Sequence, residues 1–117
     1  MASERDSIPL TLKLERRGQE LRICLAGDFA FGTSHRLDHM LDRLGDLRGH
    51  TLVLDFSATQ FVDSSGLAAL VAAKLRGDRE RFTLTIANAG GPLQRMLERT
   101  RLDELLRPAA EPQPPLS

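Results

Sequence analysis

The sequence contains no tryptophan or tyrosine, and five phenylalanines are its only aromatic residues. Proteins that recognise bases by stacking use aromatic side chains as platforms, so this shortage disfavours such a function. Sixteen lysines and arginines are matched by sixteen aspartates and glutamates, and no excess of one sign is present to attract a polyanion. We therefore expect no direct nucleic-acid partner.

Cysteine and long apolar runs are also scarce. Cys24 is the only cysteine, so neither an intrachain disulfide nor a cysteine metal cluster can form. Nowhere do about eighteen apolar residues follow one another, and the first ten residues lack the apolar core of an export signal. We expect a cytoplasmic protein without membrane insertion.

What is present is the composition of one globular domain. The chain has 117 residues, of which 41% are hydrophobic and 27% charged, enough to bury a core but too few for two domains. We expect the domain to span residues 8–107, after a flexible segment at 1–7. Residues 108–117 hold four prolines and little to bury, and we expect them to be disordered.

Apolar residues alternate with polar ones in two stretches that predict strands. Residues 8–26 read as a hairpin in which Gly18 supplies the turn, and residues 82–86 read as a later strand. Between them, the unbroken run at 51–56 is typical of a central strand that is covered on both faces.

Helical spacing follows three of these segments. Thr33 or Ser34 can cap a first helix, whose apolar residues are Leu37, Met40, Leu41 and Leu44. The second is expected to place on one face Leu67, Leu70, Val71, Lys74 and Leu75. A third is marked by Leu93, Met96 and Leu97, and a final helical turn by Leu102, Leu105 and Leu106. The order β-β-α-β-α-β-α predicts an α/β fold with a mixed sheet.

The sequence offers little support for a metal site or a phosphate-binding loop. His35 and His39 are one helical turn apart, but the sequence HRLDH lacks the glutamate of the zinc-binding motif H-E-x-x-H. His50 is not at a spacing that would make it the third ligand of a metal site. The segment NAGGPL has neither the lysine of a P-loop nor a dinucleotide fingerprint. We expect no metal and no cofactor.

The segment FVDSSGLAAL places two serines at the start of the second helix. Asp63, Ser64 and Ser65 are all good N-cap residues, and one cap uses only one of them. The G-x-S-x-G motif of a hydrolase is missing, so we expect no catalytic residue and no enzyme. A spare hydroxyl at an accessible helix N-terminus suits a phosphate acceptor, and spacing alone leaves open which serine it is.

The segment LVLDFSATQFVDSSGLAALVAA resembles the signature of the STAS domain family, specifically the stand-alone bacterial anti-sigma factor antagonists. The resemblance covers about residues 8–107 and includes LRICLAGDF, RFTLTIANAGGPLQRMLERT and LDELL. It implies a mixed sheet of four to five strands with helices packed mainly on one face.

The resemblance also implies partner switching that regulates transcription. Such proteins bind an anti-sigma factor that is also a serine kinase, and thereby release a sigma factor. Phosphorylation of the first serine of D-S-S-G ends that binding, which assigns the acceptor to Ser64, and a phosphatase would reset it. We expect the protein to be a monomer or a weak homodimer.

We hypothesise a partner-binding surface around this serine. Its members are Asp28, Phe29, Thr33, Asp63, Ser64, Ser65, Gly66 and Leu67. The alternative for Phe29, and for Phe31, is an ordinary core position.

Two positions depart from the family pattern. Ala30 stands where the common G-E-L-D has its second acid, and Arg101 replaces the glycine of a common T-G-L. The first departure bears on phosphorylation, since that acid lies near the acceptor in the family. The alternative function is a non-phosphorylated STAS regulatory subunit of an ABC-type lipid-transport complex. Ala30 leans toward this alternative, while the retention of both serines favours the switch.

Overall fold

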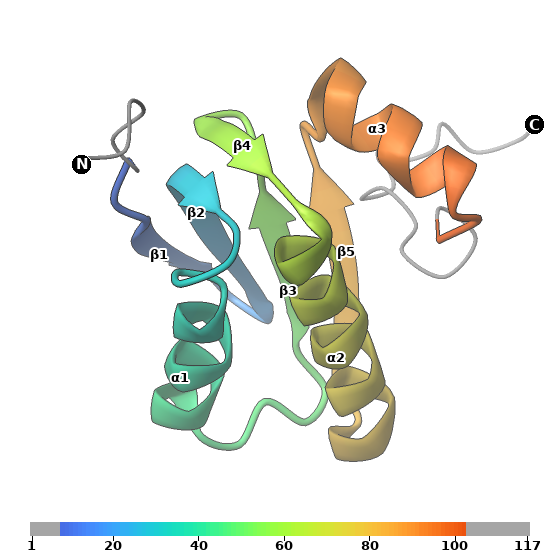
Figure 1. Ribbon diagram of the computed structural model, residues 1–117. Coiled ribbons are helices and arrows are strands. Elements are labelled where there is room, and N and C mark those ends of the chain that lie inside the picture. The colour runs from blue at the N-terminus through green and yellow to red at the C-terminus, as the bar shows by residue number, and fades with distance from the viewer. Residues whose placement is uncertain (1–7, 103–117) are drawn as a thin grey trace, which may run out of the picture.

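The computed structural model describes residues 8–102, in which five strands and three helices follow the order β-β-α-β-β-α-β-α (Figure 1). The elements are β1 (Thr11–Arg17), β2 (Glu20–Phe29), α1 (His35–Leu44), β3 (Thr51–Asp55), β4 (Thr59–Val62), α2 (Ser64–Glu80), β5 (Thr83–Ala87) and α3 (Gly90–Arg99). The predicted α/β fold with a mixed sheet is confirmed. Our expectations for residues 1–7, for Leu105 and Leu106 and for the tail lie outside the described residues.

The sheet has the order β1-β2-β3-β5. β1 and β2 form the expected antiparallel hairpin, and Gly18 in its turn adopts φ of 59°, a left-handed conformation that glycine tolerates. β3 pairs in parallel with β2 on one side and with β5 on the other. Parallel pairing on both sides makes β3 an interior strand of the sheet, as its apolar sequence predicted.

Strand β4 is absent from the predicted order. It pairs in parallel with the end of β2, after a shift of register between Gly27 and Asp28. Its four residues are exposed or half-buried and show no alternating pattern. The pairing depends on where β2 projects beyond its contact with β3, which no local pattern reports.

A single apolar core lies between the sheet and its helices. Leucines of β2 and β3 face α1 and α2, which cover the same face of the sheet (Figure 1). The fully buried members include Leu21, Leu25, Leu37, Leu41, Leu52, Leu54 and Leu70. α3 adds Leu93 and Leu97 to this core. No helix among residues 8–102 has the length and apolar character needed to cross a membrane.

Two local predictions for the helices are correct only in part. Ser34 is the N-cap residue of α1, but neither its side chain nor that of Thr33 forms a cap hydrogen bond. On α2 the buried face runs through Leu67, Leu70 and Ala73, while Leu75 is 51% exposed. Leu67 and Leu70 of the predicted face are buried and Val71 packs against the core, so spacing misplaced Leu75 rather than the whole face.

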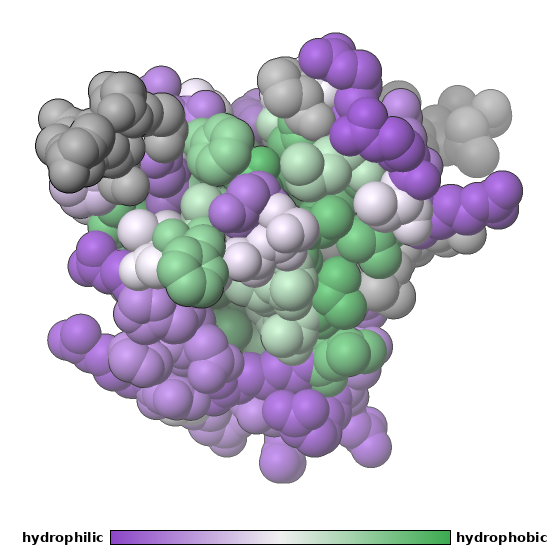
Figure 2. Space-filling view, in the orientation of Figure 1, coloured by the Kyte–Doolittle hydropathy of each residue, from purple (hydrophilic) through white to green (hydrophobic). Residues whose placement is uncertain are grey.

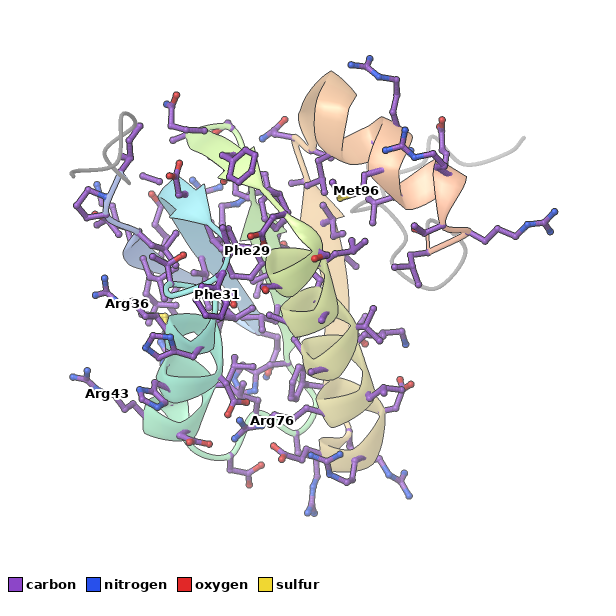
Figure 3. The ribbon with its side chains drawn as sticks, in the orientation of Figure 1. Phe29, Phe31, Arg36, Arg43, Arg76 and Met96 are labelled. Atoms are coloured by element: carbon purple, nitrogen blue, oxygen red, sulfur yellow. The ribbon has the colours of Figure 1, made fainter. Side chains whose placement is uncertain are left out.

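Arg76 joins the two helices that cover the sheet. Its terminal nitrogens donate to Asp38 at 2.8 Å and to Asp42 at 2.7 Å on α1, and Nε donates to Glu80 at 3.1 Å. Figure 3 shows this side chain between the lower ends of α1 and α2. Burial by itself lowers the pKa of Arg76, but these hydrogen bonds outweigh it and hold that pKa above its usual value.

The end of α3 keeps its left-handed turn without a glycine. Arg101 has φ of 62°, and the N–H of Leu102 donates to the carbonyl of Leu97 at 2.8 Å. This bond resembles the Schellman closure in which glycine is the usual residue. The departure at Arg101 therefore leaves the helix end in place.

Gly66 permits α2 to approach β2 closely. A Cβ at this position would lie 2.1 Å from the carbonyl oxygen of Phe29 and 3.0 Å from its ring. No side chain fits that space, so the first turn of α2 can rest on the end of β2 only with glycine here.

The variant Gly66→Ala is expected to lose about 3 kcal/mol or more of unfolding free energy, because backbone must move to admit the methyl group. Gly91→Ala in α3 is the matched control, since its methyl meets only the flexible end of Arg95. Urea unfolding of both variants checks this, and equal midpoints would contradict the close-packing argument.

Candidate functional site

Asp63 starts helix α2. Its backbone is extended, with φ of −112°, and its Oδ1 accepts a hydrogen bond from the N–H of Gly66 at 3.0 Å. This arrangement is an N-cap, which satisfies one of the unpaired N–H groups of the first turn. Of the three predicted capping candidates, Asp63 is therefore the residue used.

The second oxygen of Asp63 binds another segment. Oδ2 accepts from the N–H of Phe31 at 3.1 Å and so links α2 to the loop between β2 and α1. Burial alone would raise the pKa of Asp63, but hydrogen bonds from the N–H groups of Gly66, Phe31 and Ser65 outweigh it. The pKa of this carboxyl is held below its usual range, and Asp63 is charged at neutral pH.

Ser64 and Ser65 differ in their exposure. Ser64, the first residue of α2, is exposed, whereas Ser65 is half-buried. Within residues 8–102 the hydroxyl of Ser64 forms no hydrogen bond. An enzyme that modifies a serine needs access to its hydroxyl, and this geometry favours Ser64 over Ser65.

The loop that follows β2 is closed by its own hydrogen bonds. The hydroxyl of Thr33 donates to the carbonyl of Asp28 at 2.7 Å and accepts from the N–H of Ala30 at 3.0 Å. The N–H of Ser34 donates to the carbonyl of Ala30 at 2.8 Å. Thr33 therefore acts within the loop, and its hydroxyl is engaged there.

Phe31 projects from this loop. Its side chain is 85% exposed and lies on the near side of the molecule above α1 (Figure 3). Since its N–H is bound by Asp63 and the loop is closed on both sides, the ring is presented from a fixed backbone. An exposed aromatic held this way is a typical anchor for a protein partner.

Four other members of the hypothesised surface are buried. Phe29 is 0% exposed and packs edge-to-face on Phe56, with ring centroids 6.0 Å apart. Gly66 and Leu67 are buried residues of the first turn of α2. Asp28 is 3% exposed, and its carboxylate accepts from the N–H of Ile8 at 3.2 Å. These residues shape the surface from below, and their side chains are not on it.

The exposed position of Phe31 was not predicted from the sequence. Alternation along β2 continues the inward set through Phe29 and would carry Phe31 into the core as well. β2 ends at Phe29, however, and the turn that follows reverses the chain. The available signal was Gly32 and Thr33, which favour a turn after Phe31.

The other candidates do not assemble a chemical site. The rings of His35 and His39 meet edge-on at 5.4 Å, but residues 8–102 bring no three His, Cys, Asp or Glu side chains into a metal-binding group. A groove of about 920 Å³ lies between β4 and α3 and is lined by Phe61, Met96 and Arg99 among others. Ser64 does not line it.

Removing the carboxylate in Asp63→Ala is expected to lower the free energy of unfolding by roughly 0.5–2 kcal/mol at pH 7, the usual cost of a lost cap. Because the folded-state pKa is depressed, this stabilisation is complete above the unfolded-state value near about 4 and disappears as pH falls through the folded-state pKa. Denaturant unfolding between neutral pH and acid measures it.

Asp46→Ala is the control, since Asp46 is an exposed loop residue that accepts one backbone hydrogen bond, from Arg48. A stability difference for Asp63→Ala that stays constant from neutral pH into acid would contradict the charged cap.

Several solved structures share this fold. The chain is similar to an anti-sigma factor antagonist from Mycobacterium paratuberculosis, with 21% identity and a TM-score of 0.69 over 88% of this chain and 87% of that one. It is also similar to an uncharacterized DUF3478-family protein with a SpoIIAA-like fold from Shewanella loihica, with 12% identity and a TM-score of 0.58 over 92% and 87%. At these identities the likeness establishes the fold.

Family membership comes from the sequence itself. No curated protein matches the chain. The family model described as "Mlab, STAS domain" matches residues 12–108, which is most of the chain and includes every helix and nearly every strand residue described above. The protein is therefore a member of the STAS domain family.

Proposed function

We propose that this STAS domain is an anti-sigma factor antagonist. It binds an anti-sigma factor that is also a serine kinase, frees a sigma factor, and is switched off when the kinase phosphorylates Ser64. The domain itself performs no catalysis in this scheme and needs no cofactor. Transcription is then regulated by whether the kinase binds this domain or the sigma factor.

The proposal rests on the different roles of Asp63 and Ser64 at the start of α2. Asp63 supplies the cap, so Ser64 is left exposed and its hydroxyl is not needed to hold the helix. A modification of Ser64 can therefore change the surface without undoing the fold. The similarity to an anti-sigma factor antagonist supports the same assignment.

The charge of a phosphate is sufficient to switch partners. Phosphorylation would add about −1.5 to −2 charges beside the ionised Asp63, and the helix N-terminus favours that anion by only ~0.3–1 kcal/mol. Burying the dianion next to Asp63 in an interface costs several kcal/mol, and a penalty of ~4 kcal/mol weakens binding about a thousandfold. The same phosphate on the free domain meets water, so the fold is retained.

Intact-mass analysis after incubation with ATP and each candidate anti-sigma kinase tests the acceptor. We expect one phosphate on the wild type and on Ser65→Ala, which is the matched control, and none on Ser64→Ala. A phosphate retained by Ser64→Ala would reassign the acceptor. No phosphate from any kinase, together with tight binding to a transporter ATPase subunit, would replace the proposal by the transport alternative.

Binding of the kinase by Ser64→Asp is expected to be at least tenfold weaker than by Ser64→Ala, since even one carboxylate at this position must be desolvated beside Asp63. Isothermal titration calorimetry gives both affinities. Equal affinities would count against a charge-based switch.

Phe31→Ala is expected to weaken kinase binding by about 30-fold, the effect of a hot-spot aromatic worth ~2 kcal/mol, while its unfolding free energy changes by less than ~0.5 kcal/mol. The reason is that an 85% exposed ring contributes little to the fold. Leu75→Ala is the control, as Leu75 is also exposed but lies about 16 Å along α2 from Ser64. Unchanged affinity of Phe31→Ala would remove Phe31 from the docking surface.

A further inference from the structure

A small apolar groove lies between α1 and α2. Its floor is formed by Leu37 and Leu41 of α1 and by Ala73 of α2, all buried, and its α2 wall by Ala69 and Ala72. Ser34, His35 and Asp38 complete the lining. Figure 2 shows apolar surface in this region, between the polar outer side of α1 and the green residues along α2.

The groove has the size of one apolar side chain. Its volume is about 180 Å³, and an apolar cavity of about 150 Å³ is known to hold one benzene molecule. It exists because α2 presents only alanines on this side, so nothing from α2 fills the space opposite Leu37 and Leu41. Filling such a space usually stabilises a protein, and leaving it open forgoes that contribution.

The margin of the groove carries negative charge. Asp38 lines it and is 67% exposed as a side chain, and Asp42 follows one turn later. Both carboxylates share the single guanidinium of Arg76, which also binds Glu80. The arginines of α1, Arg36 and Arg43, point away from α2 (Figure 3). A basic residue of a partner is thus favoured beside the groove.

The groove also continues the surface around Ser64. Ser34 and His35, at its upper end, immediately follow the loop that presents Phe31, and Ala68 and Ala72 continue the exposed side of α2 below Ser64. A protein that contacts Phe31 and Ser64 together therefore has the groove within the same footprint.

We propose that the groove receives one large apolar side chain of the protein partner, with a basic residue of that partner next to it on Asp38. Phe31 and this groove then form a reciprocal pair, in which each protein inserts one side chain into the other. The inference rests on the proposed function, because the occupant is the anti-sigma kinase that Ser64 contacts.

Filling the groove tests the proposal. Ala72→Leu places a larger side chain at the exposed edge of the groove, and we expect kinase binding at least tenfold weaker with a melting temperature that is unchanged or higher. Ala58→Leu makes the same enlargement at an exposed alanine before β4, outside the groove, and should bind like the wild type. The measurements are calorimetric titration with the purified kinase and thermal unfolding.

NMR methyl resonances of the wild-type protein give a second test, which does not require any variant to fold. Addition of the kinase should shift the signals of Ala69, Ala72 and Ala73 and leave that of Ala58 in place. If Ala72→Leu binds the kinase within twofold of the wild type, or if the methyl signals of the groove do not shift, the groove is not a docking site. The proposed function is unaffected by either result. If no kinase binds even the wild type, the proposed function fails and the groove's occupant with it.

The basic residue is tested separately by Asp38→Asn. We expect three- to tenfold weaker binding and a smaller dependence of affinity on salt, whereas Asp78→Asn, an exposed acid on the far part of α2, should match the wild type. An unchanged affinity and salt dependence for Asp38→Asn overturns the assignment of the basic neighbour.

Discussion

The contact between the first turn of α2 and the end of β2 is the constraint on which the rest of this site depends. Gly66 allows the helix backbone to meet the carbonyl of Phe29, and Asp63 binds the N–H groups of both Gly66 and Phe31. One carboxylate thereby fixes where the helix begins and where the neighbouring loop lies. Ser64 and Phe31 are exposed, and their positions are set by the neighbouring Asp63 and Gly66, which are hydrogen-bonded and packed within the fold.

Helix α2 serves the core and the surface with the same kind of residue. Leu67, Leu70 and Ala73 are buried against the sheet, while Ala72 and Leu75 stay apolar on the outer side. The outer side of this helix is not apolar throughout, since Ser64, Asp78 and Arg79 are also exposed on it. Its alanines also limit how well α2 fills the space beside α1, and Arg76 joins the two helices by ion pairs below that space.

Most of the fold could be predicted because its signals are local. The alternation in β1 and β2, the unbroken apolar run of β3 and the turn at Gly18 are each contained in a few residues. β4 escaped prediction because it is short and owes its pairing to the projecting end of β2. Leu75 was misplaced on the buried face of α2 because spacing alone does not distinguish the buried Ala73 from the exposed Ala72 and Leu75.

The sequence by itself determined the kind of site: an acid, two serines and a glycine at the start of a helix, in a chain of the STAS family. The tertiary structure decided which residue does what, because exposure is a property of packing and not of residue type. It assigned the cap to Asp63, left Ser64 exposed, buried Phe29 and turned Phe31 outward. Two phenylalanines separated by one residue thus have opposite roles, since β2 ends between them.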